Sequence, residues 1–197
     1  MKTKLLTLLV AASMGVAAYG AIDFSPVPTE RVLEGWKFAG LKFHENGRAI
    51  SYEHPRGWSY SGGGARIRFT PPNLTQAVAE IDQAPVQGKL ELTEETAKLL
   101  QQKALASVPP DSQKVTLVSE AVNPFQVNTH STYEAVVAYE AFGQEFMLGI
   151  VYVNLPDTQL RFRSVALKAD FEKVHGPFRS SIFSLEWEKT PAPAAKN

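Results

Sequence analysis

The chain has 197 residues, 44% of them hydrophobic, with 20 basic side chains, 20 acidic side chains and no cysteine. This length is typical of one domain, and the balanced charge gives the chain no strong electrostatic reason to hold nucleic acid. The lack of cysteine excludes disulfides, cysteine metal sites and a lipid-linked cysteine anchor, so we expect a fold that depends on its hydrophobic core.

Residues 1–20 have the pattern of a secretory signal peptide. Lys2 and Lys4 precede an apolar run, and small residues allow cleavage after Gly20, with cleavage after Ala18 as the alternative. The run is shorter than the ~20 residues that a membrane span needs, which disfavours an uncleaved anchor. Without the two lysines, 18 basic and 20 acidic side chains give a net charge of −2. We therefore expect an exported protein, periplasmic or extracellular, with no stable membrane span.

The first part of the chain predicts strands and turns. Residues 21–35 contain two prolines and little apolar periodicity, so we expect a linker before a single domain over residues 36–188. A strand is predicted at residues 36–43, and Asn46-Gly47 is a hairpin turn because both residues readily take positive φ. A returning strand follows, and we expect residues 61–64, Ser-Gly-Gly-Gly, to form a flexible loop.

The middle of the chain predicts two more strands, a helix and a further strand. Residues 65–70 alternate apolar and basic side chains, and residues 77–81 give a weaker strand pattern. Thr93 is a candidate N-cap, followed by two glutamates, for a helix that ends near Ser107 before two prolines. Residues 115–122 are predicted to form the next strand.

The C-terminal part, residues 132–187, has the strongest pattern. Two apolar strands meet at a predicted two-residue loop, Gly143-Gln144, which would pair Ala141 with Phe146 and Tyr139 with Leu148. A third strand is predicted at residues 159–168.

A closing helix is expected from its apolar stripe, with a candidate N-cap at Asp170 and a kink or fresh start at Pro177. We expect Phe178 of this helix to lie across the surface formed by Tyr139 and Leu148. The tail, residues 189–197, has no core-forming residues and is predicted to be disordered.

These elements predict an α+β fold with an antiparallel twisted sheet covered by helices. The motif Tyr52-Glu53-His54-Pro55-Arg56-Gly57-Trp58 and the order of elements after it resemble the PsbP, Mog-type and DcrB-like superfamily, over residues 38–188. The resemblance implies an αβα sandwich and a largely non-enzymatic membership, which includes photosystem accessory proteins, small-GTPase binders and periplasmic proteins without a defined role. None of the residues matches a functional residue of that superfamily.

The sequence predicts no catalytic site, metal site or cofactor. The four histidines are dispersed at residues 44, 54, 130 and 175, whereas a zinc site needs three or four ligands that converge. The sequence also lacks the Gly-x-Ser-x-Gly motif of many hydrolases.

Four arginines are the candidate site for a ligand or partner. Arg66 and Arg68 share one strand face, and Arg161 and Arg163 share another. If the two strands are close, the four guanidinium groups can form a patch for an anion or a partner. The alternative is four separate surface arginines on outward faces.

These observations favour an exported accessory protein that binds a protein partner or a small ligand without catalysis. The alternative is a secreted hydrolase whose active site is dispersed along the sequence. A pocket that joins His130 or His175 to a serine, or to a carboxylate with a shifted pKa, would favour the hydrolase.

Overall fold

The computed structural model describes residues 22–86, 88 and 90–188, so the predicted signal peptide and C-terminal tail lie outside the described residues. The elements in chain order are β1 (Ile22–Leu33), β2 (Trp36–Glu45), β3 (Arg48–Tyr52), β4 (Ser59–Gly63), β5 (Arg66–Thr70), β6 (Val78–Pro85), α1 (Glu94–Leu105), β7 (Gln113–Val127), β8 (His130–Ala141), β9 (Gln144–Asn154), β10 (Thr158–Leu167), α2 (Phe171–Ser181), a 3₁₀ turn (Ile182–Ser184) and β11 (Glu186–Trp187).

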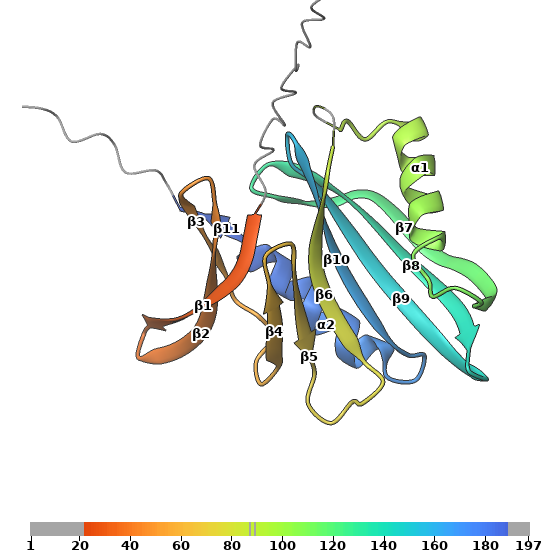
Figure 1. Cartoon of the computed structure of the whole chain (residues 1–197), viewed down its shortest axis with the longest axis horizontal. Coiled ribbons are helices and arrows are strands. Elements are labelled where there is room, and N and C mark those ends of the chain that lie inside the picture. The colour runs from red at the N-terminus through yellow and green to blue at the C-terminus, as the bar shows by residue number, and fades with distance from the viewer. Residues whose placement is uncertain (1–21, 87, 89, 189–197) are drawn as a thin grey trace, which may run out of the picture.

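The strands form two antiparallel sheets (Figure 1). Sheet A has the order β1-β2-β3-β11, and sheet B has the order β4-β5-β6-β10-β9-β8-β7. The predicted α+β class and the antiparallel pairing are confirmed, but the strands of residues 22–52 form a sheet of their own instead of joining the main one. The Asn46-Gly47 hairpin is also confirmed, because Glu45 pairs with Arg48 and His44 with Ala49.

Two segments predicted as irregular are strands. Residues 22–33, within the predicted linker, form β1 on the edge of sheet A, with a register shift between Asp23 and Val27. An edge strand with a bulge tolerates proline, because a missing N–H there breaks no essential ladder bond. The expected flexible loop at residues 61–64 largely forms β4, paired with β5 from Ser59 to Gly63.

The hairpin between β8 and β9 turns one residue earlier than predicted. Ala141 pairs with Gln144 and Tyr139 with Phe146, so the loop is Phe142-Gly143 instead of Gly143-Gln144. Phe142 and Gly143 have φ of 52° and 73°, values that indicate a type I′ turn. The revised register moves each partner by two residues, so the predicted grouping of side chains into two faces is retained.

Phe142 is unfavourable at the tip of this hairpin. Its ring is 96% exposed and its φ is positive, a conformation that asparagine tolerates far better than a bulky residue. We expect Phe142→Asn to raise the free energy of unfolding by about 1 kcal/mol, measured by urea denaturation. Gly143→Ala, at the next turn position, should lower it; a loss of stability in Phe142→Asn would contradict the turn assignment.

The two helices cover opposite faces of sheet B. Leu100 and Ala104 of α1 pack with Leu148, Ile150 and Tyr152 of β9. On the other face, α2 packs against the alternate side chains of the same strand together with residues of sheet A; this second core contains Val151, Val153, Phe162, Val174, Phe178 and Ile182. The prediction that Phe178 lies across Tyr139 and Leu148 is therefore wrong. Helix α1 covers those two side chains, and Phe178 packs on the opposite face of sheet B.

The ends of the helices differ from one another in their capping. Thr93 caps α1 as predicted, because its side chain accepts a hydrogen bond from the Thr96 amide. Asp170 precedes α2 but makes no side-chain capping bond. The helix continues through Pro177 to Ser181, so the predicted fresh start at Pro177 is wrong and the alternative, a kink, stays a prediction. Val174 and Phe178, on either side of the proline, are both buried in one core, and this packing favours a continuous helix.

The strand β7 forms one edge of sheet B and is irregular along its length. Its pairing with β8 shifts register between Gln113 and Thr116, between Leu117 and Ser119, and between Val122 and Gln126. The strand therefore continues beyond the predicted end at residue 122, because a bulge accommodates Pro124.

Candidate functional site

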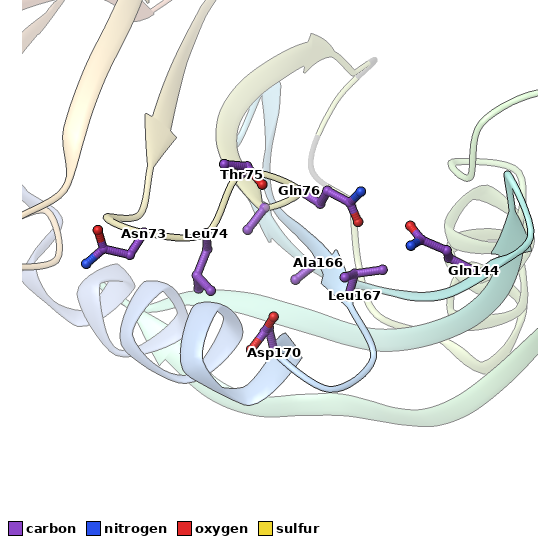
Figure 2. Close-up of a pocket in the computed structure, with 9 residues that line it drawn as sticks. Asn73, Leu74, Thr75, Gln76, Gln144, Ala166, Leu167 and Asp170 are labelled. Carbon is purple, nitrogen blue, oxygen red and sulfur yellow. The ribbon is translucent and has the colours of Figure 1, made fainter.

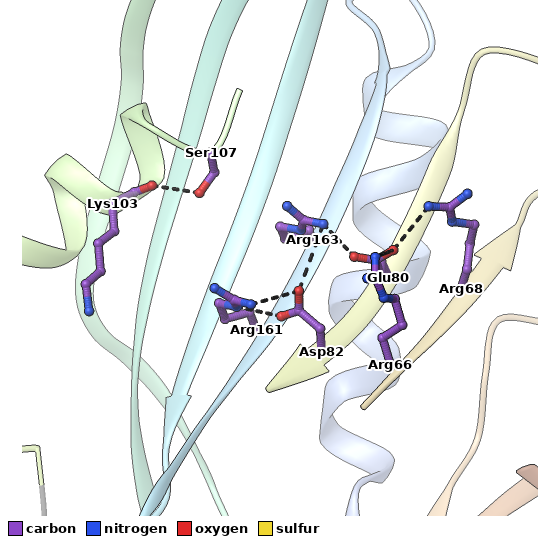
Figure 3. Close-up of polar contacts among 8 residues, drawn as sticks. All are labelled: Arg66, Arg68, Glu80, Asp82, Lys103, Ser107, Arg161 and Arg163. Atoms are coloured by element: carbon purple, nitrogen blue, oxygen red, sulfur yellow. Dashed lines mark hydrogen bonds and ion pairs between the residues drawn. The ribbon is translucent and has the colours of Figure 1, made fainter. Parts of the chain in front are cut away.

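The four candidate arginines come together on one face of sheet B (Figure 3). They lie on β5 and β10, the two neighbours of β6, and β6 places acidic residues between them. Arg66 and Arg161 both pair with Asp82, which gives one row across the sheet. Arg68 and Arg163 both pair with Glu80, which gives a second row. We call these six residues the arginine face.

Ion pairs join the rows of the arginine face. Arg161 holds Asp82 with two hydrogen bonds, of 2.6 and 3.0 Å. Glu80 lies within 2.5 Å of Arg163, 3.3 Å of Arg68 and 4.0 Å of Arg66. The carboxylates thus hold the guanidinium groups in a fixed array.

The arginine face keeps a surplus of positive charge and of donors. Four guanidinium groups carry about 20 N–H donors, whereas two carboxylates offer about eight acceptor positions. The side chains of Arg66 and Arg68 are 65% and 55% exposed, while that of Glu80 is 5% exposed. Most of the unused donors are therefore accessible from solvent, and the acidic oxygens largely are not.

An apolar cavity of about 380 Å³ adjoins the second row. Arg68, Glu80 and Arg163 line one end of it, and the segment from Ser107 to Pro110, which follows α1, lines another side. Its remaining lining is Val78, Tyr139, Leu148 and Val165. Cavities of this volume accommodate small ligands or single large side chains. The site thus combines a cationic surface with an apolar recess.

Sequence reasoning identified the four arginines but not the two carboxylates between them. Glu80 and Asp82 flank the buried Ile81 on β6, so their shared face can be read from the strand alternation alone. The pairing of β6 with β10 cannot be predicted from strand alternation, because it joins residues about 80 positions apart along the chain, such as Arg163 and Glu80.

A second polar cluster lies between sheet B and α2. The Ser164 hydroxyl is 2.9 Å from His175 Nδ1, and His175 Nε2 is 3.4 Å from Glu134 Oε1. Arg179 donates two hydrogen bonds to Glu134, of 2.6 and 2.8 Å. A serine, a histidine and a carboxylate in this order are the components of a hydrolytic triad.

Burial argues against catalysis at this cluster. Ser164 is 1% exposed and His175 is 9% exposed, so a substrate cannot reach the hydroxyl. Ser164 and Glu134 lie on β10 and β8, and His175 fills the space above Gly149 of the strand between them, where an added Cβ would lie 2.3 Å from Nδ1. The cluster therefore fixes α2 to sheet B.

The Glu134 carboxylate gives this contact a dependence on pH. Burial raises its pKa, but hydrogen bonds from His175 and Arg179 outweigh burial and lower the pKa from 4.5 to about 2. A depressed pKa in the folded state contributes stability that is complete above the unfolded-state pKa and is lost as pH falls through the folded-state pKa.

We expect acid unfolding to depend on Glu134 between pH 4.5 and about pH 2. Over this window, the free energy of unfolding of the wild type should fall more steeply than that of Glu134→Gln, measured by urea denaturation at several pH values. Other carboxylates contribute to both proteins and cancel in the comparison. Parallel curves would show that the pKa of Glu134 is not depressed.

His130 lines a different cavity, of about 400 Å³, beside Glu45. The Glu45 side chain is already engaged, because Oε2 accepts hydrogen bonds from Arg48 at 2.6 Å and from the Trp187 indole at 3.0 Å. A smaller cavity, of about 260 Å³, lies between Asn73, Gln144 and the start of α2 (Figure 2). Its acidic residue, Asp170, pairs with Lys173 at 2.7 Å.

The described residues contain neither a candidate metal site nor a helix that could span a membrane. Over residues 22–86, 88 and 90–188, His, Asp and Glu side chains form no group of three that could hold a metal ion. Within the same ranges, none of the helices has the length and apolar character needed to cross a membrane.

Comparison with known proteins gives similarity in fold only. No protein-family profile matches the chain, and neither does any curated protein. The fold is of the antiparallel α+β class, with an exposed arginine face. The solved structures that match include a PsbP protein. Synechocystis PsbP is 10% identical, with a TM-score of 0.46, over 91% of this chain and 99% of its own.

Two other solved structures match at a similar level. LpqN of Mycobacterium tuberculosis, involved in cell envelope biogenesis, is 13% identical, with a TM-score of 0.48, over 85% of this chain and 92% of its own. A Pseudomonas aeruginosa protein of unknown function is 16% identical, with a TM-score of 0.49, over 83% of this chain and 99% of its own. Similarity at this level carries no information on what the present chain binds.

Proposed function

We propose that this chain is an exported, non-enzymatic accessory protein that binds an acidic partner through Arg66, Arg68, Arg161 and Arg163. The observation that carries the proposal is the arginine face, on which four guanidinium groups surround two carboxylates and retain a net charge of +2. An arginine array of this kind suits planar carboxylates, because each guanidinium group presents parallel N–H donors.

The fold supports this role by holding the array rigid. Sheet B carries the arginines on β5 and β10, with β6 paired between them, and one helix packs on each face of the sheet. Helix α1 covers the part of this face that lies toward β7–β9, and the side chains of Arg66 and Arg68 on β5 remain open to a partner. The alternative function, a hydrolase, needs an accessible nucleophile. Ser164 of the serine–histidine pair is buried and does not supply one.

Binding to a labelled oligoglutamate peptide tests the proposal. We expect the wild type to bind the peptide with an affinity that decreases with salt. The double variant Arg66→Gln/Arg68→Gln should lose at least tenfold in affinity, and it leaves Glu80 paired with Arg163 and Asp82 paired with Arg161. Arg56→Gln, an exposed arginine outside the face, is the control. Absence of binding, or equal loss in the control, would contradict the proposal.

Export is tested separately by cell fractionation and mass measurement. We expect the protein in the periplasm or the medium, with a mass that corresponds to cleavage after Gly20 or Ala18. A full-length protein confined to the cytoplasm would contradict export without affecting the binding proposal.

A further inference from the structure

We propose that the partner of the arginine face is an extended protein segment in which two acidic residues and one apolar residue occupy alternate positions. The inference rests on the proposed function and adds the pattern of the bound segment to it. Three observations carry it: the spacing of the rows, the apolar row that follows them and the cavity at their end.

The side chains of sheet B form rows at right angles to the strands. Arg66, Asp82 and Arg161 make the first row, and Arg68, Glu80 and Arg163 make the second. The third row is apolar, because Val165 pairs with Val78 on one side and with Leu148 on the other. Two cationic rows are thus followed by one apolar row along the same face.

The row spacing matches that of an extended peptide. Successive rows are two residues apart along a strand, which is about 6.6 Å. Side chains at alternate positions of any extended peptide share one face with the same spacing of about 6.6 Å. A segment aligned with the strands can therefore place its acidic side chains over the first and second rows and its apolar side chain over the third.

The third row lies in the cavity beside the second row. The floor of this cavity contains Leu148 and Val165, and the segment from Ser107 to Pro110 lines its side. Leu148 is fully buried and belongs to the core under α1, so this floor is rigid. The cavity, of about 380 Å³, has room for one leucine or phenylalanine side chain of the partner.

The carboxylates of the arginine face disfavour dense polyanions such as nucleic acid. Glu80 and Asp82 stand in the middle of each row and lower the net charge of the face to +2, which weakens its attraction for a ligand with closely spaced phosphates. Single carboxylates spaced by a residue can instead bind the outward N–H donors of Arg66 and Arg68. This charge pattern favours an acidic protein segment.

Two synthetic peptides with the same composition test the inference by fluorescence anisotropy. One is Asp-Ser-Asp-Ser-Phe, with its acidic and apolar residues on one face, and the other is Asp-Asp-Ser-Ser-Phe, whose acidic residues point to opposite faces. We expect the first to bind at least tenfold more tightly than the second. Arg66→Gln or Arg68→Gln should each reduce binding of the first peptide at least fivefold.

The apolar row is tested with Val165→Thr, which keeps the side-chain shape but replaces one methyl group with a hydroxyl. We expect it to weaken binding of the first peptide about threefold or more, whereas Val118→Thr, on the exposed strand β7, should not change it. Circular dichroism checks that each variant is folded. Equal binding of the two peptides with arginine dependence retained would overturn the pattern and leave the proposed function intact; no binding of either peptide or of oligoglutamate would overturn both.

Discussion

We expect Gly149→Ala to lower the free energy of unfolding by about 3 kcal/mol, which is the upper range for overpacking a core. An added Cβ would lie 2.3 Å from His175 Nδ1, 2.5 Å from His175 Cε1 and 3.0 Å from the Ser164 hydroxyl. His175 cannot move away easily, because its ring stacks on Phe171 at 4.8 Å and bonds Ser164 and Glu134. Urea denaturation at neutral pH measures the effect.

Gly176→Ala is the matched control, since it makes the same change in α2 with no atom within 4 Å of the added methyl group. It should stabilise the protein by up to about 1 kcal/mol, because alanine favours a helix more than glycine does. In Gly149→Ala/His175→Ala the space is restored, so the double variant should lose less than the two single variants together. A Gly149→Ala protein as stable as the wild type would show that α2 does not rest on this strand.

We expect Glu134→Ala to be comparably destabilising, by about 3 to 5 kcal/mol. Glu134 is the shared acceptor for Arg179 and His175 of α2, and its side chain is only 12% exposed. Without it the Arg179 guanidinium, which also lies over the Phe125 ring at 4.8 Å, remains partly buried without a counter-ion. Denaturation at neutral pH measures the effect.

Glu140→Ala is the control for Glu134→Ala, because it removes a glutamate from the same strand face. Glu140 pairs with Lys114, whose side chain is 74% exposed, so solvent screens that ion pair. We expect a change below about 1 kcal/mol in this variant. Similar losses in the two alanine variants would contradict a special role for the cluster at α2.

Local patterns predicted much of the fold. Alternation along β5 and β10 placed each pair of arginines on one strand face, and the apolar stripe of α2 identified its buried side. The turn of the β8–β9 hairpin was misplaced by one residue, because a bulky Phe142 at positive φ contradicts the usual turn preferences. The strand β1 was missed because its prolines argue against a strand, whereas a strand at the edge of a sheet tolerates proline.

Contacts between distant parts of the chain could not be predicted from such patterns. Glu80 meets Arg163 across 83 positions, and Glu134 meets Arg179 across 45. The fit of His175 over Gly149 depends on which strands are neighbours and on which face α2 packs. Alternation determines which side chains share a face, but strand order determines which of those side chains meet.

The three register shifts of β7 have a consequence for the behaviour of the protein in concentrated solution. A long, straight sheet edge would offer free N–H and C=O groups to another molecule, but an edge interrupted at three points presents no continuous ladder for a second copy to extend. We therefore expect β7, the longest of the described strands, to resist fibril growth, a property that matters for a chain without disulfides to hold it folded.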